Sequence, residues 1–248
     1  MGASDPAPGP PAGGRVAVVI PALDEEGRIA ATVEAARTLP HVATVVVVDD
    51  GSSDATAEVA RGAGAVVVRH RRNRGKAAAM ESGAGAVAVL DAHDGGAPHH
   101  LLFLDADLGP TAKEAEPLIH PVLEGAADMT IALLPRTGPG GGWGFVLRLS
   151  AGGIERMTGW RATQPLSGQR CITRAAFDRL TPLAHGFGVE TALTIDALRE
   201  GFRVLEVPAN FAHRVTGRDL RGVLHRARQY RDVARALADR EVRARLRR

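Results

Sequence analysis

The chain has 248 residues, of which 45% are hydrophobic and only 4% aromatic, so it can bury a sizeable core built mainly from Val, Ile, Leu and Ala. Its single cysteine, Cys171, excludes an internal disulfide and favours a reducing compartment, with Cys171 as a buried small residue. No uninterrupted apolar run approaches the roughly 18 residues that span a bilayer, so we expect no membrane span.

The two ends of the chain differ in composition from the middle. Residues 1–14 are rich in Gly, Pro and Ala and lack the basic start and apolar segment of a signal peptide, so we expect a disordered tail. Residues 218–248 contain 11 Arg and 4 acidic residues, a net charge of +7, whereas the rest of the chain has 20 basic and 24 acidic residues, a net charge of −4. We therefore predict an α/β domain over residues 15–217 and a basic helical segment over residues 218–248. The protein is expected to be cytoplasmic, at most peripheral at the inner face of the membrane.

The middle of the chain alternates between strand-like and helix-like segments, beginning with a Val-rich run at residues 15–20 and a helical apolar pattern at residues 27–38. The pattern predicts further strands at residues 44–48, 65–68, 101–104, 129–134, 164–173 and 203–207. It predicts further helices at residues 54–61, 75–90, 145–158 and 188–200, the first with Asp54 as its N-cap and Gly62 as its stop. Such alternation is typical of an α/β fold with a mixed, mostly parallel sheet flanked by helices.

Acidic residues follow the ends of predicted strands, which is where open α/β sheets bind their ligands. Asp105 and Asp107 lie two residues apart after the fourth strand, so their carboxylates can share one hard cation. That cation can bridge the phosphates of a nucleotide diphosphate and neutralise the charge on the leaving group. The alternative interpretation is a turn with solvated acids. Asp49, Asp50 and Asp54 form a second acidic group, in which one carboxylate can accept hydrogen bonds from a base or ribose, or all can serve turn and cap chemistry.

Lys76 is one of only two lysines among 31 basic residues, the other being Lys113. It follows a glycine at the start of an Ala-rich helix, a position that suits a phosphate or a nearby carboxylate. The alternative is a solvated lysine at a helix start.

Two further residues are candidates for a site. His213 follows the last predicted strand and can be a third metal ligand, or it can be structural. Glu190 begins a helix after Gly186-Phe187-Gly188, where a ligand can approach closely, or it is an acid favoured by the helix dipole.

The C-terminal segment has one apolar stripe at helical spacing, with arginines on its other faces. This pattern predicts an amphipathic helix. The helix either docks on the domain or associates with an anionic membrane surface or an anionic acceptor.

Together these motifs resemble the family-2-like glycosyltransferases of GT-A (Rossmann-like) fold. The motifs that carry the resemblance are, in chain order, residues 18–26 (VVIPALDEE), 48–54 (VDDGSSD), 74–76 (RGK), 105–107 (DAD), 165–170 (PLSGQR), 186–190 (GFGVE) and His213. Each motif is weak evidence by itself, but the ordered set is specific and covers roughly residues 16–221. The most similar branches are glucosyl-3-phosphoglycerate synthase and the polyprenyl-phosphate sugar synthases.

The resemblance makes residues 15–217 a GT-A glycosyltransferase domain and implies a role for each matching residue. It implies nucleotide-sugar binding by Pro21, Ala22, Leu23, Glu25, Asp50, Lys76 and Asp105. It implies that Asp105 and Glu190 act in catalysis, Asp105 facing the sugar and ribose and Glu190 the donor sugar or the acceptor hydroxyl. Asp107 and His213 would hold Mg²⁺ or Mn²⁺.

The implied partners are a UDP- or GDP-sugar donor and an acceptor that is either a small phosphorylated or hydroxyl compound or a polyprenyl phosphate. Where the phosphoglycerate enzymes carry a basic residue after a glycine run, this chain has Trp143-Gly144-Phe145, so the acceptor stays open. We expect no nucleic-acid partner, and a homodimer is an open alternative. Two other functions are considered: a sugar nucleotidyltransferase, although the Pro-Ala-Leu-Asp-Glu-Glu loop replaces the usual Gly-rich one, and a non-catalytic GT-A-like nucleotide-binding domain.

Overall fold

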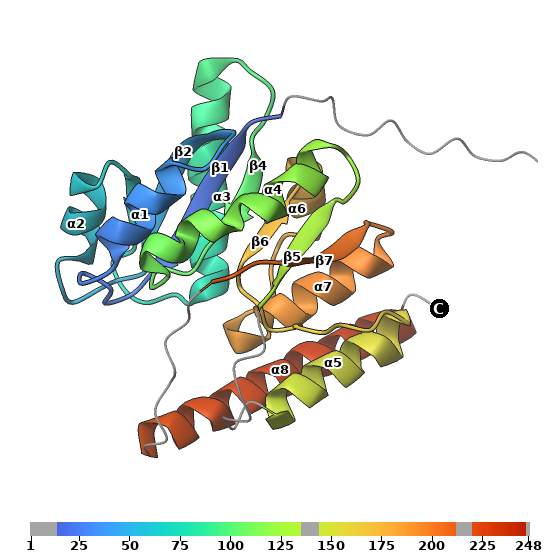
Figure 1. The fold of residues 1–248 in the computed structure, drawn as a ribbon. Helices are drawn as coiled ribbons and strands as arrows, with labels where there is room; N and C mark the ends of the chain where they lie inside the picture. The colour runs from blue at the N-terminus through green and yellow to red at the C-terminus, as the bar shows by residue number, and fades with distance from the viewer. Residues whose placement is uncertain (1–13, 135–143, 212–219, 247–248) are drawn as a thin grey trace, which may run out of the picture.

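A computed structural model describes residues 14–134, 144–211 and 220–246, without the side chains of residues 220–228 and 243–246. Its centre is a seven-stranded sheet of order β3-β2-β1-β4-β6-β5-β7 (Figure 1). The strands are β1 (Val16–Ala22), β2 (Val42–Asp49), β3 (Val66–Arg69), β4 (His100–Phe103), β5 (Met129–Leu133), β6 (Arg170–Ile172) and β7 (Val204–Pro208).

The neighbouring strands are parallel except where β6 pairs with β4 on one side and β5 on the other. This arrangement confirms the expected α/β fold with a mixed, mostly parallel sheet. The predicted strand at residues 164–173 is wrong over most of its length, because only its last part, β6, joins the sheet. The preceding residues form a loop whose backbone carbonyls accept hydrogen bonds from the side chain of Arg170.

Helices cover both faces of the sheet (Figure 1). The α-helices are α1 (Ile29–Arg37), α2 (Thr56–Gly62), α3 (Lys76–Asp94), α4 (Glu116–Leu123), α5 (Gly144–Thr158), α6 (Arg174–Leu180), α7 (Val189–Arg199) and α8 (Leu220–Leu246), with short 3₁₀ helices η1 (Gly109–Ala115) and η2 (Gly186–Gly188). Helices α4 and α6 and both 3₁₀ helices were not predicted. Proline at two positions of α4, Pro117 and Pro121, hides its helical pattern.

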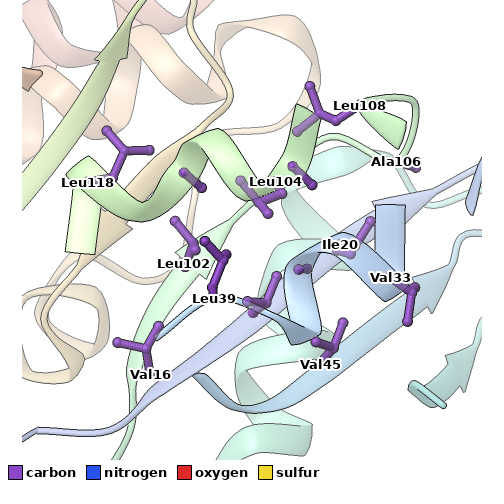
Figure 2. Packing of buried hydrophobic residues seen from close by; sticks show 14 of the residues in the cluster. Val16, Ile20, Val33, Leu39, Val45, Leu102, Leu104, Ala106, Leu108 and Leu118 are labelled. Atoms are coloured by element: carbon purple, nitrogen blue, oxygen red, sulfur yellow. The ribbon is translucent and has the colours of Figure 1, made fainter. Parts of the chain in front are cut away.

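The alternation of side chains along β1 divides the core into two layers. Val16, Val18 and Ile20 pack with α1 and α4 on one face, as Figure 2 shows for part of this cluster. Ala17 and Val19 belong to the cluster on the other face, which contains α3, α6 and α7. Because successive residues of a strand point to opposite faces, one Val-rich strand anchors both layers.

The C-terminal helix α8 lies beside α5 and α7 and against η2 (Figure 1). A third apolar cluster joins these helices through Val146, Ile154, Ile195, Val233 and Leu237. An amphipathic helix was predicted here. Among its described side chains Val233, Ala236 and Leu237 are buried, as the docking alternative expected, whereas Tyr230 is exposed. No helix among the described residues combines the length and apolar character needed to cross a bilayer.

Candidate functional site

The candidate site lies where β1, β2 and β4 end side by side. Because these strands are adjacent and parallel, their carboxyl ends meet at one edge of the sheet. Pro21 and Ala22 are the last residues of β1, and the side chain of Leu23 beyond them is exposed. Asp50 directly follows β2, and its backbone N–H donates to the carbonyl of Ala22 (2.8 Å). Asp105 lies just beyond β4, so three of the predicted site segments converge.

Lys76, Asp105 and Glu190 form an ionic cluster, here called the Lys76 cluster. Lys76 begins α3, and Glu190 lies in the first turn of α7. Lys76 Nζ lies 2.8 Å from Asp105 Oδ1 and 2.9 Å from Glu190 Oε1. Burial disfavours the charged ammonium, but the attraction of the two carboxylates outweighs it and raises the pKa of Lys76. The cluster keeps contact with solvent, since 32% of the Lys76 side chain is exposed.

Gly168 allows this cluster to form. A Cβ atom at Gly168 would lie 2.5 Å from Lys76 Nζ and 2.9 Å from Asp105 Oδ1, which is closer than Cβ contacts allow. The next residue, Gln169, has no exposed surface, and its Nε2 donates to Asp105 Oδ2 at 2.6 Å. Both carboxylate oxygens of Asp105 are therefore held by protein groups.

A buried arginine fixes the loop that carries Gly168 and Gln169. Arg170 is 1% exposed, and its guanidinium donates to the carbonyls of Ser167 (2.8 Å) and Pro165 (3.1 Å) and to Thr194 Oγ1 (2.8 Å). Burial lowers the pKa of Arg170 to about 10, although nearby carboxylates oppose this shift. The guanidinium stays charged at neutral pH and ties the loop to α7.

Asp50 organises the turn that precedes Lys76. Its carboxylate accepts hydrogen bonds from the backbone N–H groups of Arg74 (2.9 Å) and Gly75 (2.7 Å). Its Oδ1 also lies 2.6 Å from His70 Nδ1, and His70 Nε2 lies 2.9 Å from Ser82 Oγ. Gly75 has a φ of +89°, a backbone conformation that favours glycine. The turn therefore depends both on the Asp50 carboxylate and on glycine at position 75. Asp50 thus helps to place Lys76.

The loops after β1 and β2 are joined by reciprocal hydrogen bonds. The backbone N–H of Asp24 donates to Ser52 Oγ (2.9 Å), and that of Glu25 donates to Thr56 Oγ1 (2.8 Å). Asp24 Oδ1 in turn accepts from the backbone N–H of Ser53 (2.8 Å). The predicted nucleotide-binding segment therefore has a fixed backbone.

The remaining acids of the second acidic group, Asp49 and Asp54, have turn roles, and the expected cap role is not found. Asp49 Oδ1 accepts from the Ser52 N–H (2.8 Å), and Asp49 Oδ2 pairs with Arg69. Asp54 is not the N-cap of α2, because the helix begins one residue later than expected, with Ala55 in the cap position. Asp54 instead accepts from the Thr56 backbone N–H (3.0 Å).

Asp107 is the carboxylate best suited to a cation. It is partly exposed, and it makes no hydrogen bond or ion pair with the described residues, whereas Asp105 is held on both oxygens. His213, the other predicted metal ligand, lies outside the described residues. Within the described ranges, no group of three His, Cys, Asp or Glu residues is arranged to hold a metal. At this strand end Asp107 thus supplies a carboxylate without a partner among the described residues, which fits a hard cation with oxygen ligands.

Sequence reasoning missed Gln169 and His70 as site residues. Gln169 carries no charge, and its only signal is its place in the 165–170 motif. His70 directly follows β3, at the same edge of the sheet as the other candidates, and that position was an available signal.

The chain is similar to known proteins over most of its length. The sequence model for glycosyl transferase family 2 matches residues 17–179. Glycosyltransferase AglJ of Haloferax volcanii is 29% identical in an alignment of 214 positions that covers 82% of this chain. The matched region is 65% of AglJ, so this chain spans somewhat less than two thirds of that relative.

The solved structures with a similar fold include glucosyl-3-phosphoglycerate synthase from Mycobacterium tuberculosis. Its complex with Mg²⁺ and UDP superposes with a TM-score of 0.73 at 26% identity, over 92% of this chain and 80% of that one. Its complex with Mn²⁺, UDP-glucose and phosphoglyceric acid gives a TM-score of 0.70 at 26% identity, over 92% and 81% of the two chains.

Proposed function

Because this chain belongs to glycosyl transferase family 2, we propose that it transfers a sugar from a nucleotide-diphosphate sugar to an acceptor hydroxyl or phosphate. The observation that carries this proposal is the Lys76 cluster, which gathers one ammonium and two carboxylates where β1, β2 and β4 end. Ligands of parallel sheets bind at this edge.

In this proposal the nucleotide lies along the loop after β1, contacted by Pro21, Ala22, Leu23 and Glu25. Asp50 contributes by holding the turn before Lys76. UDP is the nucleotide that best agrees with the similar structures, which bind UDP or UDP-glucose. GDP is the alternative to be tested against it.

The chemistry is assigned to the Lys76 cluster and its neighbours. Lys76 keeps Asp105 and Glu190 apart and oriented, Asp105 toward the ribose and sugar, and Glu190 toward the donor sugar or the acceptor hydroxyl. Glu190 is 12% exposed on its side chain, so it can accept a hydrogen bond from a hydroxyl group in the site.

A divalent cation, Mg²⁺ or Mn²⁺, is proposed to bind Asp107 and His213, of which only Asp107 lies among the described residues. When bound, it would neutralise charge on the diphosphate leaving group. The presence of Mg²⁺ or Mn²⁺ in the similar structures supports this assignment.

For the acceptor, we propose a small phosphorylated or hydroxyl compound or a polyprenyl phosphate. The similar structures support the first, since one contains phosphoglyceric acid. The basic C-terminal segment supports the second.

A thermal-shift panel tests the donor. UDP, GDP and their sugars are each added with Mn²⁺, and we expect the UDP compounds to raise the melting temperature most, because a ligand of the native state stabilises by RT ln(1 + [L]/Kd). A shift with GDP compounds alone would assign guanosine instead. No shift with any of them would contradict a nucleotide-sugar enzyme.

A further inference from the structure

The carboxylate of Asp105 is held from two sides by groups of different charge. Lys76 Nζ lies 2.8 Å from Oδ1, and the amide of Gln169 donates to Oδ2 at 2.6 Å. Two fixed donors on two oxygens leave the carboxylate little freedom to rotate. The Lys76 contact alone would allow the carboxylate to turn about its Cβ–Cγ bond.

The orientation of the Gln169 amide follows from its own contacts. Ser167 Oγ–H donates to Gln169 Oε1 (3.2 Å), which turns the NH₂ group toward Asp105. Gln169 is fully buried. Its backbone carbonyl accepts from the backbone N–H of Ala132 in β5 (3.0 Å), so its backbone is tied to the sheet. The charged side chain of Arg170 ties the same loop to α7. Both the side-chain amide and the backbone carbonyl of Gln169 are therefore held by protein groups.

From these contacts we infer that Gln169 is a positioning residue, which holds Asp105 toward the donor sugar and away from the cation. This inference rests on the proposed function. It divides the two carboxylates of the 105–107 motif between two tasks, because Asp105 is committed to Lys76 and Gln169 while Asp107 remains available for metal.

The neutral amide is essential to this division. A carboxylate at position 169 would face Asp105 at hydrogen-bond distance, where two like charges repel strongly. It would also compete with Asp105 and Glu190 for Lys76. A side chain of similar size without a donor would leave Asp105 Oδ2 without this partner in a partly buried setting.

The test compares Gln169→Glu and Gln169→Leu with the matched control Gln164→Glu. Gln164 is an amide of the same loop and is partly rather than fully buried, and its Nε2 donates to the backbone carbonyl of Leu134 (2.7 Å) rather than to a site carboxylate. Affinity for UDP-glucose in the presence of Mn²⁺ and affinity for Mn²⁺ alone are both measured by calorimetry, with melting temperatures as a check on folding.

We expect both Gln169 variants to bind UDP-glucose at least tenfold more weakly, with Mn²⁺ affinity within threefold of wild type, and Gln164→Glu to bind the donor as wild type does. A merely structural role would lower both affinities together. Donor affinity within twofold of wild type in either folded variant would overturn this inference and leave the proposed function standing. Failure of the wild-type chain to bind UDP-glucose or any other nucleotide sugar would overturn the proposed function, and this inference with it.

Discussion

Lys76 holds two carboxylates, those of Asp105 and Glu190, that would otherwise repel each other at the end of the sheet. The chain offers a natural control, because its other lysine, Lys113, is exposed on η1. If Lys76 acts in the site, its substitution by Ala should weaken function while that of Lys113 does not. If Lys76 is only a surface charge, the two substitutions should have the same small effect.

Lys76→Ala is expected to weaken donor binding or turnover at least tenfold, which corresponds to about 1.4 kcal/mol. Lys113→Ala should leave both unchanged. Steady-state kinetics with varied donor concentration measure the effect. If Lys76→Ala stays within twofold of wild type, Lys76 has no part in the site.

Cys171 lies in β6 with no exposed surface, as expected of a buried small residue. Burial raises the pKa of its thiol to about 12. Since the thiolate is the reactive form, we expect a thiol reagent to leave the native protein unlabelled at neutral pH and to label it stoichiometrically in concentrated guanidinium chloride. Rapid labelling of the native chain would show that β6 opens easily.

At the scale of elements, strand and helix periodicity predicted the parallel half of the molecule well. The Val-rich β1 and β2 and the acids that follow them were located from the sequence, because their signals are local. The antiparallel insertion of β6 between β4 and β5 was not predicted. Strand pairing over such separations depends on contacts that no local pattern encodes, and β6 has only three residues.

The site shows the same division between local and long-range information. Lys76, Asp105 and Glu190 were each singled out by charge and position, but the ion pairs among them join α3, the end of β4 and α7. Gln169 was missed because a neutral amide in a loop gives no signal until its partner is known.

The docking of α8 depends on a buried ion pair as well as on apolar contacts. The Arg240 side chain is 4% exposed and pairs with Asp196 of α7, and the Arg240 carbonyl accepts from Arg199 (3.0 Å). Arg240→Ala leaves Asp196 without this partner, so we expect the free energy of unfolding to fall by about 1–3 kcal/mol.

Arg235→Ala is the matched control on the exposed side of α8, expected to change stability by less than about 0.5 kcal/mol. Urea denaturation measures both variants. Equal effects would mean that the Arg240 pair adds nothing to the docking of the helix.

At the scale of the whole molecule, the family match confirms membership of glycosyl transferase family 2, and the similar structures confirm the expected GT-A fold. Membrane association stays a prediction. Residues 218–248 carry a net charge of +7, but α8 keeps one face on the domain, so only part of that charge can reach a surface.

We predict weak, salt-sensitive binding to vesicles that contain anionic lipid. Each basic residue near such a surface contributes up to about 1 kcal/mol, and only within a Debye length. Substituting the exposed Arg231 and Arg235 by Gln should weaken the binding while leaving the buried Arg240 in place. Absence of co-sedimentation even at low ionic strength would rule out the membrane role and favour a small soluble acceptor.

The central claim is that a nucleotide-sugar site lies at the carboxyl ends of β1, β2 and β4, with Asp107 as its metal-binding carboxylate. Calorimetric titration of UDP-glucose into the wild-type chain and into Asp107→Ala, each with and without Mn²⁺, tests it most directly. Asp94→Ala serves as a control, since that carboxylate is exposed and lies at the far end of α3. We predict Mn²⁺-dependent binding to the wild type and to Asp94→Ala, and its loss in an Asp107→Ala variant that melts at the wild-type temperature. Unchanged metal-dependent affinity in Asp107→Ala would contradict the account.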